Sequence, residues 1–332
     1  MVIPRLALCA FVLALGVEAA ADNKPDYYWS AGPSLPEAAQ EIYPAVLNDE
    51  IFVAGGLART DQNIKVLDNV FVLKDDVWQS TTKLPEPRHH GILASAHNKL
   101  WLFGGFVNSK RGQWTNSDSV MMLDQKKGQW ISKTPMPNPI SETAAVSLNN
   151  KIHVIGGRSP AGEQNGLWHD HKDVGWHGVY NPESDIWKTA ASLPIPRNSA
   201  CAVTYKQNIH VIGGRQVNGD NLDTHSVFDV ATDSWSSAEP LPQAQAGLAC
   251  VVYRHSIFVF GGEHFIDEGG VFAQVWRYDL QKKNWQQVSV MPVPRHGLGA
   301  VTYHNKIWLI GGASAAGANK TSTVVSQLTS MK

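Results

Sequence analysis

Short apolar runs recur along the chain, and six of them end in a pair of glycines. A tryptophan precedes every pair at a fixed distance. Trp29 lies 26 residues before Gly55, and the same interval separates the other five tryptophans from their glycines. The pairs are Gly55-Gly56, Gly104-Gly105, Gly156-Gly157, Gly213-Gly214, Gly261-Gly262 and Gly311-Gly312, and the tryptophans are Trp29, Trp78, Trp130, Trp187, Trp235 and Trp285. Six identical intervals do not arise by chance, so the chain is built of six repeats.

Each repeat contains four short apolar stretches separated by turn residues. A Leu-Pro or Met-Pro pair, such as Leu84-Pro85, follows the tryptophan, and two strand-like runs come next, the second of which ends in the glycines. After a loop of variable length, a third run carries a large apolar residue seven positions before the next tryptophan, as Phe71 does before Trp78. The tryptophan lies in the fourth run. Four short strands per repeat, joined by turns that contain Gly or Pro, predict an all-β chain of stacked four-stranded sheets.

This pattern resembles the kelch repeat. The resemblance is carried by "PRHGLGAVTYHNKIWLIGG" at residues 294–312 and by strands of the type "VWRYDLQKKNW" at residues 275–285, and it covers residues 22–332. It implies a six-bladed kelch β-propeller. The last glycine pair has no tryptophan after it, and Trp29 has no repeat before it, so we expect the N-terminal strand around Trp29 to complete the last blade and close the ring. Such closure protects an edge that would otherwise be open to pairing.

Residues 1–21 are typical of a secretory signal peptide. Arg5 is followed by an uncharged apolar stretch at residues 6–17, which is too short to span a bilayer, and by small residues at 19–21 that suit signal peptidase. We therefore expect a periplasmic or secreted protein that does not span the membrane. Two cysteines remain, Cys201 and Cys250, which form either one disulfide or two buried thiols. Cys201 lies 12 residues before its glycine pair and Cys250 lies 11 residues before its own. This difference of one position favours side chains that point in opposite directions, and therefore two free thiols.

Composition narrows the function. The chain has 28 basic and 29 acidic residues, a net charge of −1 and no basic run, which argues against a nucleic-acid partner. No Gly-rich phosphate loop, G-x-S-x-G elbow or H-E-x-x-H motif is present, and the glycine pairs end strands instead of opening helices. No cofactor is expected. A galactose-oxidase-like copper site would need a cysteine-modified tyrosine, and both remaining cysteines lie on expected inner strands.

The resemblance also indicates which loops form the functional rim. Kelch proteins use the turn before each inner strand and the loop after each glycine pair, both on one face. These loops hold five arginines, whose planar guanidinium groups suit carboxylate or phosphate ligands. The alternative is that a Pro-Arg guanidinium bonds to neighbouring backbone carbonyls. The candidate ligand-binding residues in these loops are Arg88, His89, His90, Arg158, Arg197, Asn198, Arg215, His264, Arg295 and His296.

The longest loop, residues 158–178, contains two further candidates, Trp168 and Trp176, which we expect to be exposed and to stack on a sugar ring or a partner. Its histidines, His169, His171 and His177, could ligate a metal if the loop folds back. The third interpretation is a self-packed lid.

Rim carboxylates supply the candidate catalytic residues. Glu263 and Glu142, with Glu41 on the same rim, could act as general bases beside histidine or arginine. Bacterial N-acetylneuraminate epimerases (mutarotases) are kelch rings of similar size, and their pattern places a Glu directly after a strand-end glycine and an Arg six residues later. Glu263 matches the first position, but Gly269 occupies the second. Arginines from other blades could substitute.

Two functions follow from the sequence. The first is an exported propeller that binds an acidic sugar such as N-acetylneuraminate and epimerises or mutarotates it. The second is a non-catalytic propeller of the cell envelope whose rim binds a protein or peptide. A rim pocket with buried carboxylates would favour chemistry, whereas a flat face of exposed aromatic residues would favour a partner. A fold alone does not decide between them.

Overall fold

The computed structural model describes residues 26–59 and 63–331, so the expected signal peptide lies outside the described residues. The described part of the chain is all-β apart from one short 3-10 helix, η1 (Trp168–Asp170). Within it, no helix has the length and apolar character needed to cross a bilayer.

The strands form a series of antiparallel sheets, which we number in chain order by their innermost strand. The first sheet contains β2 (Ala45–Leu47), β3 (Glu50–Ala54), β6 (Val70–Lys74) and β7 (Val77–Ser80). The second contains β9 (Ile92–Ala96), β10 (Lys99–Phe103), β13 (Val120–Asp124) and β14 (Gln129–Lys133). The third contains β15 (Ala144–Leu148), β16 (Lys151–Ile155), β19 (His177–Asn181) and β20 (Ile186–Thr189).

The second half of the chain repeats this order. The fourth sheet contains β21 (Cys201–Tyr205), β22 (Asn208–Ile212), β23 (His225–Asp229) and β24 (Ser234–Ser237). The fifth contains β25 (Ala246–Tyr253), β26 (Ser256–His264), β28 (Gln274–Asp279) and β29 (Asn284–Val290), with β27 (Gly270–Val271) beside β26. The sixth contains β30 (Gly299–Tyr303), β31 (Lys306–Ile310), β32 (Val325–Ser330) and β1 (Tyr27–Ala31).

Short strands extend three of the loops after the glycine pairs. They are β4 (Leu57–Arg59) with β5 (Ile64–Val66), β11 (Phe106–Ser109) with β12 (Gly112–Asn116) and β8 (Arg88–His89), and β17 (Arg158–Pro160) with β18 (His171–Asp173). The sequence predicts that the second strand of each repeat ends at its glycine pair. In the fifth repeat, however, β26 continues through the pair to His264, because Glu263 pairs with both Ala246 and Val271.

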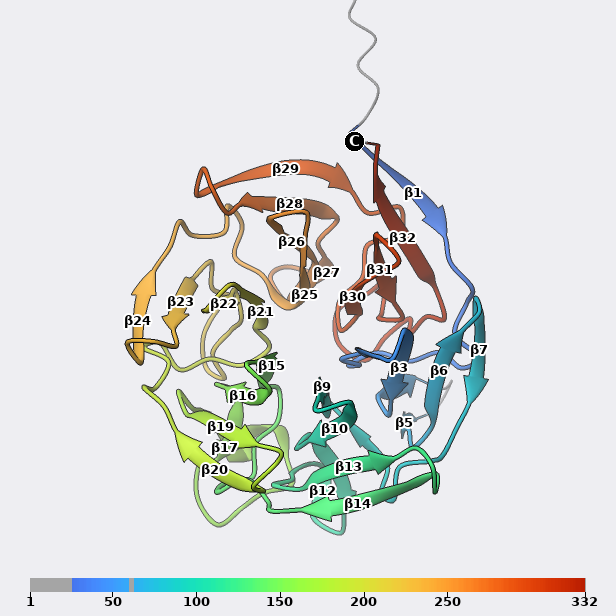
Figure 1. Cartoon of the computed structure of the whole chain (residues 1–332), viewed down its shortest axis with the longest axis vertical. Helices are drawn as coiled ribbons and strands as arrows, with labels where there is room; N and C mark the ends of the chain where they lie inside the picture. The colour runs from blue at the N-terminus through green and yellow to red at the C-terminus, as the bar shows by residue number, and fades with distance from the viewer. Residues whose placement is uncertain (1–25, 60–62, 332) are drawn as a thin grey trace, which may run out of the picture.

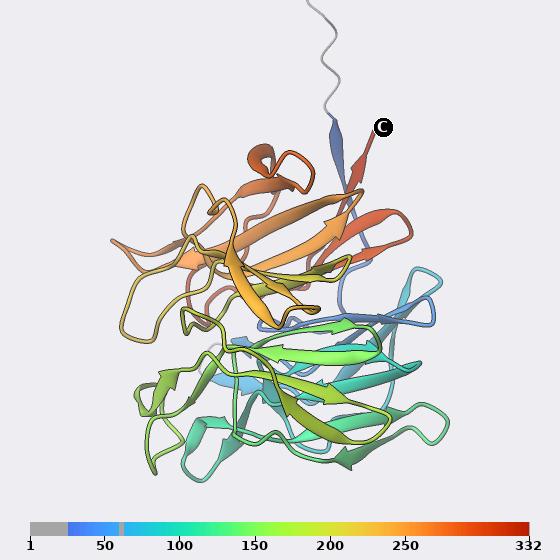
Figure 2. The same cartoon turned by 60° about the vertical axis from the view of Figure 1, so that its left-hand side comes forward.

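The sheets stand side by side around a common axis, as Figure 1 shows. Their innermost strands contact one another in the order β2, β9, β15, β21, β25 and β30, and β30 contacts β2 again. The turned view in Figure 2 shows the strands of the sheets stacked as thin layers with loops projecting at their ends. Apolar side chains between neighbouring sheets form the core, so each hydrophobic cluster draws residues from two sheets.

The glycine pairs allow neighbouring sheets to approach closely. Gly55 and Gly56 have positive φ angles of 64° and 100°. Gly56 donates its N–H to the carbonyl of Arg88 in the next repeat at 2.8 Å, and a Cβ on Gly55 would collide with that same carbonyl. The contact recurs in every repeat, and the last glycine, Gly312, donates to Ala39 at 2.8 Å. Only glycine combines this conformation with this approach.

The repeat tryptophans fix the outer strands. The Nε1 of Trp78 donates to Pro33 O at 2.8 Å, and that of Trp235 donates to Ala191 O at 2.7 Å, so each reaches the turn of the preceding repeat. Trp29 also bonds to the preceding repeat, although to a strand: β1 pairs with β32, and the Trp29 Nε1 donates to Ser289 Oγ on β29 at 2.9 Å. The strand around Trp29 therefore completes the sheet of the last repeat.

The expectation of two free thiols is wrong, because Cys201 and Cys250 form a disulfide between the innermost strands of the fourth and fifth sheets. The difference of one position between them predicts side chains that point apart. The sheets are arranged around an axis, however, so one face of each sheet packs against the opposite face of the next sheet. Residues of opposite phase on consecutive sheets therefore face each other, and their Cα atoms lie 5.8 Å apart.

Candidate functional site

One residue of each repeat adopts the left-handed conformation in the turn that precedes the innermost strand. Four of these residues are polar, namely Glu41, His90, Glu142 and Ser199, with φ angles of 50–55°. The other two are Gly247 and Gly297. A non-glycine residue in this region costs about 1–3 kcal/mol, and such strain concentrates at functional sites. The turn adopts this conformation in all six repeats, so the fold holds these four polar side chains at equivalent positions.

Backbone hydrogen bonds link these residues from sheet to sheet. Gly247 donates to Ser199, Gly297 donates to Gly247, and Glu41 donates to Gly297, at 2.7–3.0 Å. His90 N donates to Glu41 O at 3.2 Å. The residue before each left-handed position also pairs with the residue after a glycine pair, as Ser141 does with Arg158 and Asn198 with Arg215. The two loop sets predicted from the sequence therefore lie together on one face.

A cavity of about 570 Å³ opens on this face, which is within the usual range for small-molecule sites. Polar and aromatic side chains from loops of several repeats surround it. Its lining consists of Gln40, Glu41, Leu57, Arg59, Ile64, His90, Trp114, Glu142, Trp168, Arg215, Glu263, Phe265, His296, Gly317 and Ala318. Its three carboxylates come from the first, third and fifth repeats, so they converge only when the sheets pack around their common axis.

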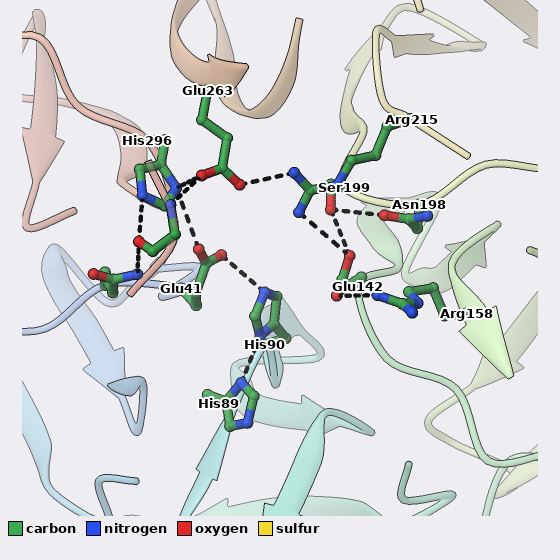
Figure 3. A network of polar contacts seen from close by, with 12 residues as sticks. Glu41, His89, His90, Glu142, Arg158, Asn198, Ser199, Arg215, Glu263 and His296 are labelled. Carbon is green, nitrogen blue, oxygen red and sulfur yellow. Dashed lines mark hydrogen bonds and ion pairs between the residues drawn. The ribbon is translucent and has the colours of Figure 1, made fainter. Parts of the chain in front are cut away.

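Glu263 and Arg215 form an ion pair at the edge of this cavity (Figure 3). Arg215 Nη1 lies 2.7 Å from Glu263 Oε1, and the N–H of Gly317 donates to Glu263 Oε2 at 2.7 Å. Position 269, six residues after Glu263, is a glycine. The arginine that pairs with Glu263 is Arg215, which comes from the preceding repeat. Burial lowers the pKa of Arg215, but the charges of Glu142 and Glu263 outweigh it and raise the pKa above its ordinary value.

Glu142 lies deeper and is held by groups from two repeats. Arg158 Nη1 donates to its Oε1 at 3.2 Å and Ser199 Oγ donates to its Oε2 at 2.6 Å. The Arg215 Nη2 lies 4.0 Å from the same Oε2. Burial raises the pKa of Glu142, but the charges of Arg158, His90 and Arg215 prevail and lower it. Glu142 is therefore a fully bonded carboxylate.

Glu41 contacts two imidazoles. Its Oε2 lies 2.9 Å from His90 Nε2, and its Oε1 lies 3.5 Å from His296 Nδ1, which is also 3.4 Å from Glu263 Oε2 (Figure 3). Burial raises the pKa of Glu41, but the charge of His90 and the hydrogen bonds of His296 and His90 lower it well below its ordinary value. Burial lowers the pKa of His296, and the same two carboxylates raise it above its ordinary value.

The structure does not bring three of the predicted arginines to the cavity. Arg88, Arg197 and Arg295 are buried, and their guanidinium groups donate to backbone carbonyls. Arg197, for example, donates to Gly213 O at 2.8 Å, to Val211 O at 3.1 Å and to Ile195 O at 3.1 Å. Arg88 donates to Gly104 O and Arg295 to Val324 O. These contacts match the alternative in which the Pro-Arg guanidinium ties the turn to its own repeat.

Other candidates are divided between the cavity and its surroundings. His90, His296 and Trp168 line it, and Arg158 stacks on the Trp168 ring at 3.5 Å without lining it. Asn198 donates to Asp173 Oδ1 at 2.6 Å, whereas His264 lies against Phe272. His89 stands behind His90. The cavity lining does not include these last three.

The long third loop does not act as one unit. Trp168 is 39% exposed at the cavity, but Trp176 is partly buried against Trp187 and the core, so the expectation that both are exposed is wrong for Trp176. His171 stacks on Phe106 and His177 bonds to His153, while His169 stays in solvent. Across residues 26–59 and 63–331, no group of three metal-ligating side chains is placed to hold an ion.

Two aromatic residues of the site, Trp114 and Phe265, were not predicted from the sequence. Trp114 lies on β12 and packs at right angles on both His89 and Trp168. Phe265 follows β26 and is 61% exposed. Both lie in loops after a glycine pair, and Trp114 falls outside the fixed interval of the six repeat tryptophans. A tryptophan that the repeat does not require was the available signal.

Comparison with known proteins identifies the family. A model of the KLHDC2/KLHL20/DRC7 Kelch-repeats domain matches residues 44–239 and 169–332. The chain belongs to the kelch-repeat family. Kelch-like protein terF of Aspergillus terreus is 28% identical over 223 residues, which are 64% of this chain and 48% of terF. Kelch-like protein 35 of Mus musculus is 26% identical over 196 residues, 58% of this chain and 30% of that protein.

Beta-scruin of Limulus polyphemus is 27% identical over 189 residues, 56% of this kelch chain and 20% of beta-scruin. The chain thus spans less than half the length of these relatives. Among solved structures, YjhT superposes with a TM-score of 0.76 at 18% identity, covering 89% of this chain and 96% of YjhT. At that identity the match shows the fold, which is an all-β kelch propeller.

Proposed function

We propose that the cavity binds an acidic sugar, such as N-acetylneuraminate, and exchanges its two anomers by acid–base catalysis. One observation carries this proposal. Three buried carboxylates, Glu41, Glu142 and Glu263, meet two histidines at the base of a cavity whose walls include Trp114 and Trp168. This arrangement matches the pocket with buried carboxylates that the sequence analysis set as the sign of chemistry.

The charges around the cavity favour an anionic ligand. The three carboxylates are matched by Arg158, Arg215 and His296, the last of which has a raised pKa. The cluster therefore has no excess negative charge to repel a sugar carboxylate. Arg59 lines the cavity edge and adds a positive charge there. The aromatic walls, with the Trp168 ring already stacked on Arg158, offer an apolar face for a sugar ring.

Anomer exchange needs only a proton acceptor and a proton donor. The acceptor takes the proton of the anomeric hydroxyl, the bond between the anomeric carbon and the ring oxygen breaks, and the donor protonates that oxygen. Closure on the other face reverses each transfer, so no cofactor is consumed. Glu263 stands at the cavity as the acceptor, and Arg215 pairs with it and presents a guanidinium to the ligand. Positioned acid–base groups of this kind typically contribute 10²–10⁴-fold.

The test is the exchange rate between the anomers of N-acetylneuraminate, measured by NMR saturation transfer with and without the mature chain. We expect the protein to accelerate exchange and Glu263→Gln to reduce the acceleration at least ~10²-fold. Arg295→Met is the matched control, because Arg295 is a buried rim arginine outside the cavity. Unchanged exchange in the presence of the wild-type chain would refute the proposal.

We propose in addition that the six sheets are the six blades of one ring, closed by β1, and that residues 1–21 direct export. The cyclic order of contacts between innermost strands and the pairing of β1 with β32 support the ring. The apolar stretch at residues 6–17 supports export to the periplasm or the medium. Mass spectrometry of the chain recovered from the periplasm tests the second point, with a new N-terminus near Asp22 expected and an uncleaved cytoplasmic chain contradicting it.

The second candidate function is the binding of a protein or peptide of the cell envelope. Phe265 and Ile266 favour it, because they are 61% and 66% exposed next to the cavity. Exposed apolar side chains of this kind commonly mark contact surfaces. Changing Ile266, which is not part of the cavity lining, to serine would weaken capture of such a partner from an envelope extract while leaving sugar exchange in place.

A further inference from the structure

Three hydrogen bonds in a row connect Glu41 to β12 of the second repeat through two histidines, and Figure 3 shows the two that join Glu41, His90 and His89. Glu41 Oε2 lies 2.9 Å from His90 Nε2, the Nδ1 atoms of His90 and His89 lie 2.7 Å apart, and His89 Nε2 lies 3.0 Å from the carbonyl oxygen of Gln113. All three side chains are buried, so water does not replace these bonds. Each contact at such a distance needs one proton between its two atoms.

The number of protons in this chain of contacts is fixed by chemistry. A carbonyl oxygen only accepts, so the Nε2 of His89 carries a proton. The contact between the two Nδ1 atoms requires one proton, and the contact between His90 and Glu41 requires another. Two neutral imidazoles supply only two protons, one each. Three contacts therefore hold one proton more than two neutral histidines and a carboxylate possess.

We propose that His90 carries this additional proton at neutral pH, as an imidazolium paired with Glu41, and is the acid that protonates the sugar's ring oxygen. Both His90 and Glu41 line the cavity, whereas His89 does not. His89 is thus a positioning residue that fixes which nitrogen of His90 faces Glu41. The catalytic part of this inference rests on the proposed anomer exchange; the proton count does not.

Neighbouring groups place the proton on His90. Burial and the charge of His90 lower the pKa of His89 to about 3, so His89 is not the cation. Glu41 is also faced by His296 and by Arg215, both of which favour its ionised form. Glu142 attracts positive charge on His90 from the third repeat. Tyr43, below the cavity, stays neutral, because burial and then the carboxylates Glu41 and Glu142 raise its pKa.

The proton changes the charge of the whole site. With it, the three carboxylates stand against two guanidiniums, His296 and His90, which leaves one net positive charge. That charge suits a ligand with a single carboxylate. During ring opening His90 would give its proton to the ring oxygen and become neutral, while Glu263 takes the anomeric proton, and closure would return both. The number of protons in the site is the same before and after the exchange.

The test measures the ring nitrogens directly, in the mature chain labelled with ¹⁵N-histidine at pH 7 without sugar. His90 signals are assigned by their loss in His90→Gln. We expect both nitrogens of His90 to be protonated and only Nε2 of His89. In Glu41→Gln the new amide can donate to His90 Nε2, so His90 should become neutral with its proton on Nδ1. Glu142→Gln removes the same charge from the equivalent position of another repeat, without a hydrogen bond to His90, and should leave His90 doubly protonated.

A wild-type His90 with only one protonated nitrogen would overturn the inference, as would a Glu142→Gln variant that neutralises His90 as fully as Glu41→Gln does. In the exchange assay, Glu41→Gln should lower kcat about 10²-fold or more with little change in KM. Loss confined to KM would refute the catalytic role. If the wild-type chain exchanges no sugar, the proposed function fails, and the nitrogen spectrum still decides where the proton lies.

Discussion

Two pairs of buried histidines connect the stability of this protein to pH. His153 Nδ1 lies 2.9 Å from His177 Nε2 in the third sheet, and His210 Nδ1 lies 2.8 Å from His225 Nε2 in the fourth. His177 Nδ1 faces the carbonyl oxygen of Ala191 at 3.3 Å and so carries its proton there. Its Nε2 therefore accepts from His153, and both rings are neutral. Burial, as the largest cause, lowers the pKa of both His153 and His177 to about 4.

The direction of the pH effect follows from these values. The unfolded chain binds protons at these histidines below pH 6.5, whereas the folded chain resists binding until about pH 4. Their contribution to stability is therefore complete above pH 6.5 and is lost as the pH falls from 6.5 toward 4. Between pH 7 and pH 5 the protonation of each histidine lowers the free energy of unfolding by about 2 kcal/mol. One pair, treated as two independent sites, lowers it by about 4 kcal/mol.

The repeats themselves supply the matched substitution. Phe258 and Val275 occupy the positions of His153 and His177 in the fifth sheet. We therefore predict that the double variant His153→Phe, His177→Val loses about 4 kcal/mol less than the wild type between pH 7 and pH 5. Urea unfolding followed by tryptophan fluorescence at the two pH values gives the difference. Because acidic groups are common to both chains, their titration cancels.

Equal losses of unfolding free energy in the two chains would refute this reasoning. So would a wild-type chain whose stability is the same at both pH values. His169→Asn is the control for the histidine content of the chain, because His169 is 77% exposed and should change the pH dependence of stability very little.

Three further predictions concern the stability of the fold. Replacing both Cys201 and Cys250 by alanine should lower stability by about 2–4 kcal/mol, since the disulfide closes a loop of 49 residues; an unchanged urea midpoint would contradict this. Deleting residues 22–31 removes β1 and should lower the melting temperature by roughly 10 °C or more, whereas unchanged calorimetry would argue against closure by β1. Arg197→Met should cost about 3 kcal/mol of stability and leave sugar affinity unaltered, and a calorimetric loss of affinity would return Arg197 to the ligand site.

The repeat architecture could be predicted because it depends on residues that repeat. The 26-residue interval between Trp78 and Gly104 is set by one turn and two strands of constant length, so it is visible in the sequence. The contact of each glycine with the neighbouring repeat follows from its missing Cβ. The disulfide was missed because its geometry depends on how consecutive sheets meet. The positions of Cys201 and Cys250 relative to their own glycine pairs, taken alone, predict side chains that point in opposite directions.

The site was only partly predictable. The loops that hold Glu142, Glu263 and Arg215 were identified, but their pairing depends on contacts between different repeats. An arginine after proline has the same sequence signature whether it turns to a carbonyl, as Arg197 does, or to a ligand. The contact of His90 with Glu41 joins two repeats through their left-handed turns. No interval in the sequence encodes that contact, because it depends on how the first and second sheets pack against each other.

The central claim, that this cavity takes an acidic sugar, is tested most directly by thermal shift against acidic and neutral monosaccharides. A ligand at ten times its dissociation constant adds about 1.4 kcal/mol of stability, which gives a measurable shift. We predict that the mature wild-type chain responds to N-acetylneuraminate or a uronic acid and not to neutral sugars, and that Arg215→Met loses the response. A wild-type melting temperature that no acidic sugar changes would contradict the claim.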